Sequence, residues 1–213
     1  MSITILTCLT LLASAAADAP LFQDDFRGGL GEGWSWVREH PEAWRTTDAG
    51  LEILLEPGNM WGGANDARNV LVRPLPEIEA GALRIALTVS NDPIGQYEQI
   101  DLVWYYDDSR MVKIGLERVD GQNSLVMGRE ERDKTRTLAI IPVESTTLDV
   151  RLTVRGKEIT GEFREAPDGA WQIAGACDLP AKGKPHASIQ AYQGLPTAEH
   201  WARVTGFRVE RVE

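Results

Sequence analysis

Cysteine and histidine are scarce in this chain of 213 residues, which has two cysteines and three histidines. Cys8 lies in an apolar run at the N-terminus, and its removal with a signal peptide would leave Cys177 without a disulfide partner. We interpret Cys177 as a small buried or half-buried side chain that fills space. The histidines are scattered and show no zinc-ligand spacing: His40, His186 and His200. We therefore predict no disulfide and no metal centre.

Positive charge is also in deficit, because 22 Lys and Arg residues stand against 32 Asp and Glu residues, for a net charge of −10. An acidic surface repels phosphate backbones and anionic lipids, which argues against nucleic acid and membrane surfaces as partners. It is compatible with neutral ligands such as sugars.

Long apolar runs are lacking as well, and the run over residues 3–12 is too short to span a bilayer. Small residues follow at positions 13–17, so we expect signal peptidase to cut just before Asp18 or Pro20, although no Lys or Arg precedes the run. We predict a signal peptide over residues 1–19, one domain over residues 20–213, and a secreted or periplasmic location.

No long segment of the chain has the apolar period of a helix. Residues 81–90 and 147–155 instead alternate apolar and polar side chains, as half-buried strands do. We expect shorter strands at residues 124–128 and 138–141, separated by a charged segment, and pairing between the first and last strands. Many strands joined by Gly, Pro, Asp and Asn turns predict an all-β fold, a single antiparallel β-sandwich.

The most informative stretch is residues 97–117, which reads as two long strands joined by a tight turn at residues 107–110. One face of this hairpin is apolar and belongs to the core, with Trp104 among its residues. The opposite face is more polar than solubility requires. It carries Gln99, Asp101, Val103, Tyr105, Lys113 and Glu117. This polar face is the candidate functional site.

Several short motifs resemble a bacterial family with a concanavalin A-like jelly roll. They are FQDDF at 22–26, WSWVRE at 34–39, GLEI at 50–53, MW at 60–61, NVL at 69–71, YEQIDLV at 97–103, YDD at 106–108 and VKIGLE at 112–117. The relatives are the family related to the yeast "regulation of enolase" protein and the C-terminal sandwich domain of family-43 β-xylosidases. The resemblance covers residues 21–117 best, and it implies a carbohydrate-associated, secreted protein without an assigned reaction.

A catalytic interpretation depends on the carboxylates of the hairpin. Glu98 and Asp101 are three residues apart and face opposite sides of a regular strand, so the glucanase pattern of alternating acids is absent. Asp101 and Glu117 share a face and could form the carboxylate pair of a glycoside hydrolase or lyase. The alternative is that Lys113 and Arg84 neutralise both in a solvated network.

A sugar-binding interpretation uses aromatic rings for stacking and polar groups for the hydroxyls. We place Trp104 in the core, with Trp44 and Trp171. Trp36 and Trp61 fit a core role and a ligand role equally well, and we expect the ligand residues on the polar face and its rim. They are Trp36, Trp61, Gln99, Asp101, Tyr105, Lys113, Glu117, Gln190 and Tyr192. A structural Ca²⁺ at the Asp24–Asp25 or Asp107–Asp108 pair is weighed against turn formation, which explains both pairs better.

We therefore expect a secreted jelly roll that binds carbohydrate or another small polar ligand on its concave sheet. The alternatives are an enzyme that acts on glycans through Asp101 and Glu117, and a structural or protein-interaction module. The oligomeric state stays open.

Overall fold

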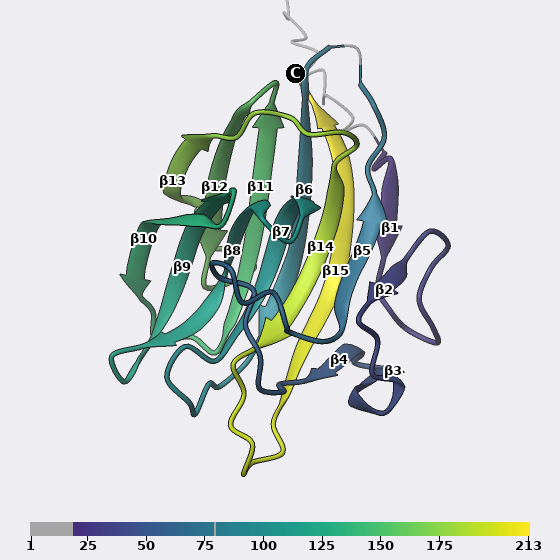
Figure 1. The fold of residues 1–213 in the computed structure, drawn as a ribbon. Coiled ribbons are helices and arrows are strands. Elements are labelled where there is room, and N and C mark those ends of the chain that lie inside the picture. The colour runs from purple at the N-terminus through teal and green to yellow at the C-terminus, as the bar shows by residue number, and fades with distance from the viewer. Residues whose placement is uncertain (1–18, 79) are drawn as a thin grey trace, which may run out of the picture.

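The computed structural model describes residues 19–78 and 80–213, which form two antiparallel sheets packed face to face (Figure 1). Within this described part, the one helical segment is a short 3-10 turn at Pro41–Ala43, and no helix is long and apolar enough to cross a membrane. The predicted all-β sandwich of jelly-roll type is confirmed. Most of the predicted signal peptide, residues 1–18 with Cys8, lies outside the described residues.

We call the sheet that contains both ends of the described fold sheet A. Its strands lie in the order β13 (Gln172–Asp178), β12 (Glu158–Arg164), β11 (Thr147–Arg155), β6 (Ala82–Ser90), β15 (Trp201–Val212), β4 (Gly50–Leu54) and β3 (Trp44–Thr47), with β1 (Phe22–Asp24) also paired to β15. The register of this last pair joins Phe22 to Val209, so the predicted pairing of the first and last strands is confirmed.

The second sheet, sheet B, carries the predicted hairpin at its centre. Its strands lie in the order β10 (Lys134–Pro142), β9 (Gln122–Glu131), β8 (Arg110–Val119), β7 (Gln99–Asp107), β14 (His186–Tyr192), β5 (Val70–Pro74) and β2 (Ser35–Val37). Asp107 pairs with Arg110, which leaves the predicted tight turn with Asp108 and Ser109 at its tip. The hairpin is therefore buried on its inner face and free to carry polar side chains on its outer face.

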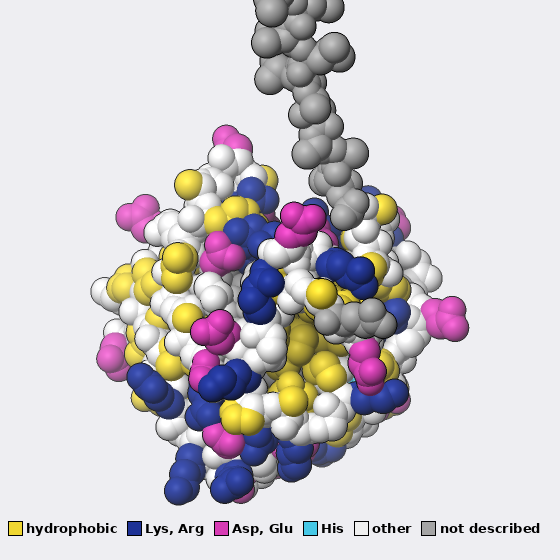
Figure 2. Space-filling view, turned by 90° about the horizontal axis from the view of Figure 1, so that it is seen from above, with side chains coloured by type: hydrophobic (Ala, Val, Ile, Leu, Met, Phe, Trp, Pro, Cys, Tyr) yellow, Lys and Arg dark blue, Asp and Glu magenta, His cyan; other side chains and the backbone are white. Residues whose placement is uncertain are grey.

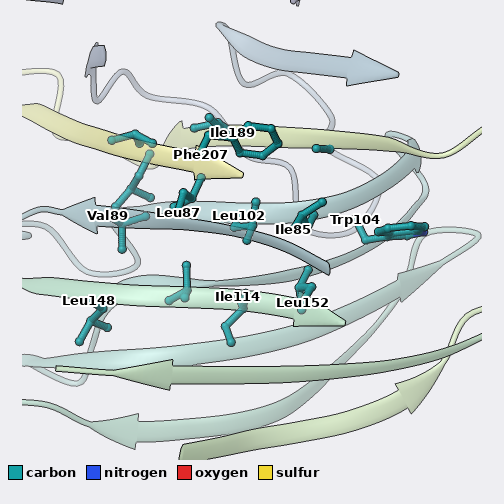
Figure 3. Close-up of a cluster of buried hydrophobic side chains, with 14 of the residues drawn as sticks. Ile85, Leu87, Val89, Leu102, Trp104, Ile114, Leu148, Leu152, Ile189 and Phe207 are labelled. Atoms are coloured by element: carbon teal, nitrogen blue, oxygen red, sulfur yellow. The ribbon is translucent and has the colours of Figure 1, made fainter. Parts of the chain in front are cut away.

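The main core fills the space between the sheets, because alternation sends every second side chain inward. Leu102 and Ile114 of the hairpin share this core with Ile85 and Leu87 of β6, as Figure 3 shows. At one end of the sandwich, Ile78, Tyr106 and other residues line an open apolar hollow. Figure 2 looks onto the molecule from above and shows hydrophobic side chains gathered between charged ones.

Two expectations about the strands were wrong. Strands β9 and β10 are long and run through the charged segment, because Arg132 and Asp133 alone form the turn, both with positive φ (56° and 59°). Two positive φ angles are typical of a type I′ hairpin turn. Such turns usually have the sequence Asn-Gly or Asp-Gly, so Arg-Asp gave no turn signal here. Strand β3 was not expected at all, because its sequence WRTT does not alternate between apolar and polar residues.

Trp171 was wrongly placed in the core. Its ring lies against two guanidinium groups, with Arg151 at 3.9 Å and Arg164 at 4.8 Å from the ring centroid. Both arginines also pair with carboxylates of sheet A, Arg151 with Glu162 and Arg164 with Asp149. The tryptophan is therefore stabilised by cation–π stacking among charged side chains. Trp104 and Trp44 do pack against the core as predicted.

Candidate ligand-binding site

The polar face of the hairpin converges on one ammonium group. In the register of β7 and β8, Gln99 opposes Glu117, and Lys113 lies four residues before Glu117 on β8. The Nζ atom of Lys113 donates to Gln99 Oε1 and to Glu117 Oε2, the latter at 3.0 Å, and lies 3.6 Å from Asp101 Oδ2. Positions i, i+2 and i+4 of a strand share a face, which is why these groups meet.

Asp101 is the most deeply buried member of this group, with 0% of its surface exposed. Burial raises the pKa of its carboxyl to about 7, while the nearby Lys113 ammonium works in the opposite direction. Its cross-strand neighbour is Gly115, where any Cβ would collide with the Asp101 carboxylate and the Ile100 carbonyl. The absence of a side chain at Gly115 therefore makes the room that the carboxylate occupies.

Strand β14 supplies the neighbouring polar groups. Gln190 opposes Asp101 and Tyr192 opposes Gln99, and both are buried. The Tyr192 ring lies 5.8 Å from Lys113 Nζ, and burial raises the pKa of its hydroxyl well above the ordinary value. Among the described residues, Tyr192 Oη and Gln190 Oε1 find no hydrogen-bond partner. These two side chains lie beside the charged group on the β14 side of the hairpin.

The connection from β4 to β5 covers part of the polar face. Its Met60 packs in a second apolar cluster with Val103, Tyr105 and Tyr192. Arg38 fastens this loop by donating to the Ala67 carbonyl at 2.7 Å. Tyr105 therefore lies beneath the loop, and its hydroxyl bonds to Asp108 in the hairpin turn.

Two bonds to Asp108, in the turn of the β7–β8 hairpin, hold Tyr105 and Arg38 in place beside this loop. Tyr105 Oη donates to Asp108 Oδ1 at 2.7 Å, and Arg38 forms an ion pair with Asp108 at 2.6 Å. Asp107 receives the Ser109 amide at 3.0 Å and pairs with Lys182 at 2.6 Å. The two aspartates therefore organise the turn and hold the loop beside it, as the turn interpretation of this pair predicts.

Trp61 lies in this loop and packs against the outer face of sheet B. Its indole lies on Gly128 of β9, where a Cβ would strike the six-membered ring, and its ring centroid is 5.2 Å from Lys113 Nζ. The side chain of Asn59 bonds both backbone groups of Trp61, at 2.9 and 3.1 Å. The next amide, that of Gly62, donates to the buried Glu130 at 3.0 Å. The tryptophan is thus held firmly against the sheet.

A pocket of about 510 Å³ opens beside Trp61. Its lining mixes aromatic, amide and charged side chains with an apolar wall from β9 and β10. The residues are Asn59, Trp61, Tyr97, Gln99, Lys113, Glu117, Val119, Asp120, Val126, Thr137, Ile140 and Gln193. A volume of this size suits a small ligand, and a few fixed polar groups on an apolar wall are typical of ligand sites.

The structure brings four of the nine predicted ligand residues to the pocket wall: Trp61, Gln99, Lys113 and Glu117. Asp101, Gln190 and Tyr192 lie buried beside this charged group, and Tyr105 lies under the loop. Trp36 is elsewhere, because it packs on Trp44 at 4.9 Å against the core between the sheets. It pairs with Leu71, whose side chain also faces that core.

Three pocket residues that sequence reasoning missed adopt the left-handed backbone conformation. They are Tyr97 (φ 67°), Asp120 (φ 51°) and Gln193 (φ 63°), in three different connections. Such conformations cost of order 1–3 kcal/mol each and concentrate at functional sites. A turn is readable from Asp120 and Gly121, but no local pattern shows that the three connections meet at one pocket.

Catalysis by a carboxylate pair fits this geometry poorly. Asp101 and Glu117 both contact Lys113, as the network alternative expected, but the network is buried and not solvated, and Asp101 has no surface that a substrate could reach. Arg84 takes no part, because it lies on sheet A and donates to Thr153. Glu98 faces away from the polar face, as its position predicts, and receives the Gly95 amide and the His200 ring. Asp101 and Glu117 therefore do not form a carboxylate pair that a substrate could reach.

The described residues contain no group of three or more His, Cys, Asp or Glu side chains that could hold a metal ion. Asp24 instead receives the amides of Phe26 and Gly31, each at 2.7 Å, and the Trp34 indole at 3.0 Å. Its carboxylate thus shapes the chain after β1. A second hollow, of about 390 Å³, lies over the outer face of sheet A. Its Asp149 is already bonded to Thr88 and Arg164.

No protein-family model and no curated protein sequence matches the chain. Solved structures do match. A GH43 protein from Bacillus licheniformis superposes with a TM-score of 0.75 at 18% identity, over 89% of this chain and 39% of that chain. The chain has a sandwich fold of the family-43 C-terminal type. It thus spans about two fifths of the length of that protein.

Two further structures match along nearly their whole length. A functionally unknown protein from Saccharomyces cerevisiae has a TM-score of 0.65 at 14% identity, over 85% of this chain and 97% of that chain. The CBM2 module of a Dit protein of a Lactobacillus casei phage has a TM-score of 0.59 at 8% identity, over 91% and 96%. At such identities the matches establish the fold alone, and the predicted resemblance is confirmed at that level.

Proposed function

We propose that this domain binds carbohydrate in the pocket beside Trp61. The observation that carries the proposal is an aromatic ring fixed next to buried, hydrogen-bonding charges: the Trp61 ring lies 5.2 Å from Lys113 Nζ, which holds Gln99 and Glu117. Pyranose rings offer an apolar face for such an indole and hydroxyls for such polar groups. The match to a CBM2 module and to GH43 proteins supports the proposal by analogy of fold.

The side chains of the pocket are preorganised by contacts within the protein. Trp61 is fixed by Asn59 and by its seat on Gly128, and Glu117 is fixed by Lys113. A site whose side chains are already ordered loses less entropy on binding, which favours affinity. We also propose secretion through the signal peptide at residues 1–19, which would bring the domain to extracellular glycans.

Binding should be measured by calorimetry with neutral xylan, cellulose and mannan oligosaccharides. We expect Trp61→Ala to weaken binding by roughly tenfold or more, since buried aromatic anchors contribute about 2 kcal/mol. Trp171→Ala is the matched control, because this tryptophan stacks between arginines of sheet A. Binding that survives Trp61→Ala unchanged would overturn the proposal, as would absence of binding to these neutral series and to charged sugar series alike.

A further inference from the structure

Among the described residues of the pocket wall, the single basic group is largely engaged by the protein. Of the described residues that line the pocket, Lys113 alone is basic. An ammonium group has three N–H donors. They face Gln99 Oε1, Glu117 Oε2 at 3.0 Å and Asp101 Oδ2 at 3.6 Å, and only 3% of the residue surface is exposed. Two of the three donors are used in hydrogen bonds, and the third lies on the side of the Asp101 ion pair, so Lys113 offers an acidic ligand little access to its charge.

The charge that remains available to a ligand is negative. Glu117 gives one oxygen to Lys113, and its Oε1 receives no hydrogen bond from the described residues. Asp120 also lines the pocket, and its Oδ1 receives only a long bond of 3.4 Å from the exposed Gln96. Buried beside Lys113, Asp101 adds a further carboxyl group. Carboxylates thus outnumber the single ammonium group, which is itself bonded to Gln99 and Glu117.

Aromatic surface accompanies these acceptors. Trp61 lies at the pocket edge, and Tyr97, 49% exposed, lines the same pocket. Aromatic faces attract cations, and carboxylates accept hydrogen bonds from ammonium groups, so the two together are suited to a protonated amine. The same ring also stacks on a sugar face.

We propose that the pocket selects sugars that carry a protonated amino group, of the glucosamine type, over neutral and acidic sugars. This inference rests on the proposed carbohydrate-binding function and names its ligand class. Glu117 and Asp120 accept hydrogen bonds from the amino and hydroxyl groups, Trp61 stacks on the ring, and the engaged Lys113 fixes Glu117 in place. Acidic sugars are excluded because their carboxylates would face carboxylates.

The test compares glucosamine oligosaccharides with their N-acetylated counterparts, with neutral xylo-oligosaccharides and with galacturonate oligosaccharides, at about pH 6, where sugar amines are largely protonated. We expect the glucosamine series to bind about tenfold more tightly than the N-acetylated series, and added salt to reduce the difference. Galacturonate oligosaccharides should bind at least as weakly as the N-acetylated ones.

Asp120→Asn is the decisive variant, because Asn tolerates the left-handed conformation of this exposed turn and the fold should stay intact. It should reduce the preference for glucosamine several-fold. Asp133→Asn is the matched control: it removes one charge from another exposed turn with positive φ, outside the pocket. The preference should survive this second change.

The outcomes separate the two proposals. Equal binding of glucosamine and N-acetylated oligosaccharides, or equal effects of Asp120→Asn and Asp133→Asn, overturns the amino-sugar inference while carbohydrate binding stands. Tighter binding of galacturonate overturns it as well. Absence of binding to all four series and to the cellulose and mannan series overturns both proposals.

Discussion

Asp101 shows how a single residue can set the character of a site without touching a ligand. Its carboxyl lies 3.6 Å from Lys113 Nζ with none of its surface exposed. Removing one partner of such a buried pair is costly, because the other charge stays buried without compensation. Lys113 is thereby kept charged, and the hydrogen bond that orients Glu117 is kept with it. The sequence predicts that these residues share a face, because alternation fixes which way each side chain points.

The buried carboxyl should make stability depend on pH. The pKa of Asp101 is raised to about 7 from an ordinary 3.8, so between these values the folded chain binds more protons than the unfolded chain. The contribution of this group is therefore complete below about pH 4 and is lost as the pH rises through about 7. Glu130, whose pKa burial also raises to about 7, contributes with the same sign.

We expect Asp101→Asn to make the decline in unfolding free energy between about pH 4 and about pH 7 shallower, by on the order of a few kcal/mol across this range. Urea unfolding at several pH values measures the slope. Asp168→Asn, in an exposed turn away from both groups, controls for the loss of one charge. An Asp101→Asn slope equal to that of the unchanged chain would contradict this account.

At the scale of elements, the hairpin was predictable and the loop over it was not. Alternation along β7 and β8 depends on neighbours two residues away, so it is readable from the sequence. The loop between β4 and β5 rests on contacts far along the chain, such as Trp61 on Gly128 and Gly62 on Glu130. No local pattern records such contacts. This is why Tyr105 was expected in the site but lies beneath the loop.

Gly128 of β9 is where the Trp61 indole of the β4–β5 loop packs on the sheet. A Cβ there would strike the far end of the Trp61 indole, a side chain that can move, and not rigid backbone. We expect Gly128→Ala to displace Trp61 and weaken glycan binding about tenfold, while the unfolding free energy changes by less than about 1 kcal/mol. Calorimetric binding and urea unfolding measure the two effects separately.

Gly63→Ala supplies the control for this substitution, because a Cβ at Gly63 would have no neighbour within 4 Å. It should leave both binding and stability unchanged. If Gly128→Ala binds glycans as tightly as the unchanged chain, the contact between Trp61 and β9 is not required for binding, and its proposed role is wrong.

At the scale of the whole molecule, the sequence predicts the class of architecture better than the meeting points of its loops. Strand patterning and turn residues suffice for a two-sheet sandwich, because each sheet must bury one apolar face. The pocket, however, is assembled from connections before β7, after β8 and after β14, where Tyr97, Asp120 and Gln193 come together. Which loops meet depends on strand order, and strand order is set by packing across the entire core.

The pairing of β1 with β15 makes the first described strand part of the core. Phe22 lies 6.1 Å from Phe207 between ring centroids, and Phe26 is completely buried with its ring 5.6 Å from that of Trp34. We expect a chain that starts at residue 27 to lose at least about 4 kcal/mol of unfolding free energy, since deletion of one buried phenylalanine side chain alone costs about 3–5 kcal/mol.

A chain that starts at residue 20 is the control for this truncation, because it keeps β1 and removes only the predicted signal peptide. Urea unfolding followed by tryptophan fluorescence compares the two chains, since Trp34 contacts both Phe26 and Phe207. Asp24 is lost with β1, and the amide of Gly31 and the indole of Trp34 lose their acceptor. Equal midpoints for the two chains would show that β1 is dispensable and that the sandwich closes without its first strand.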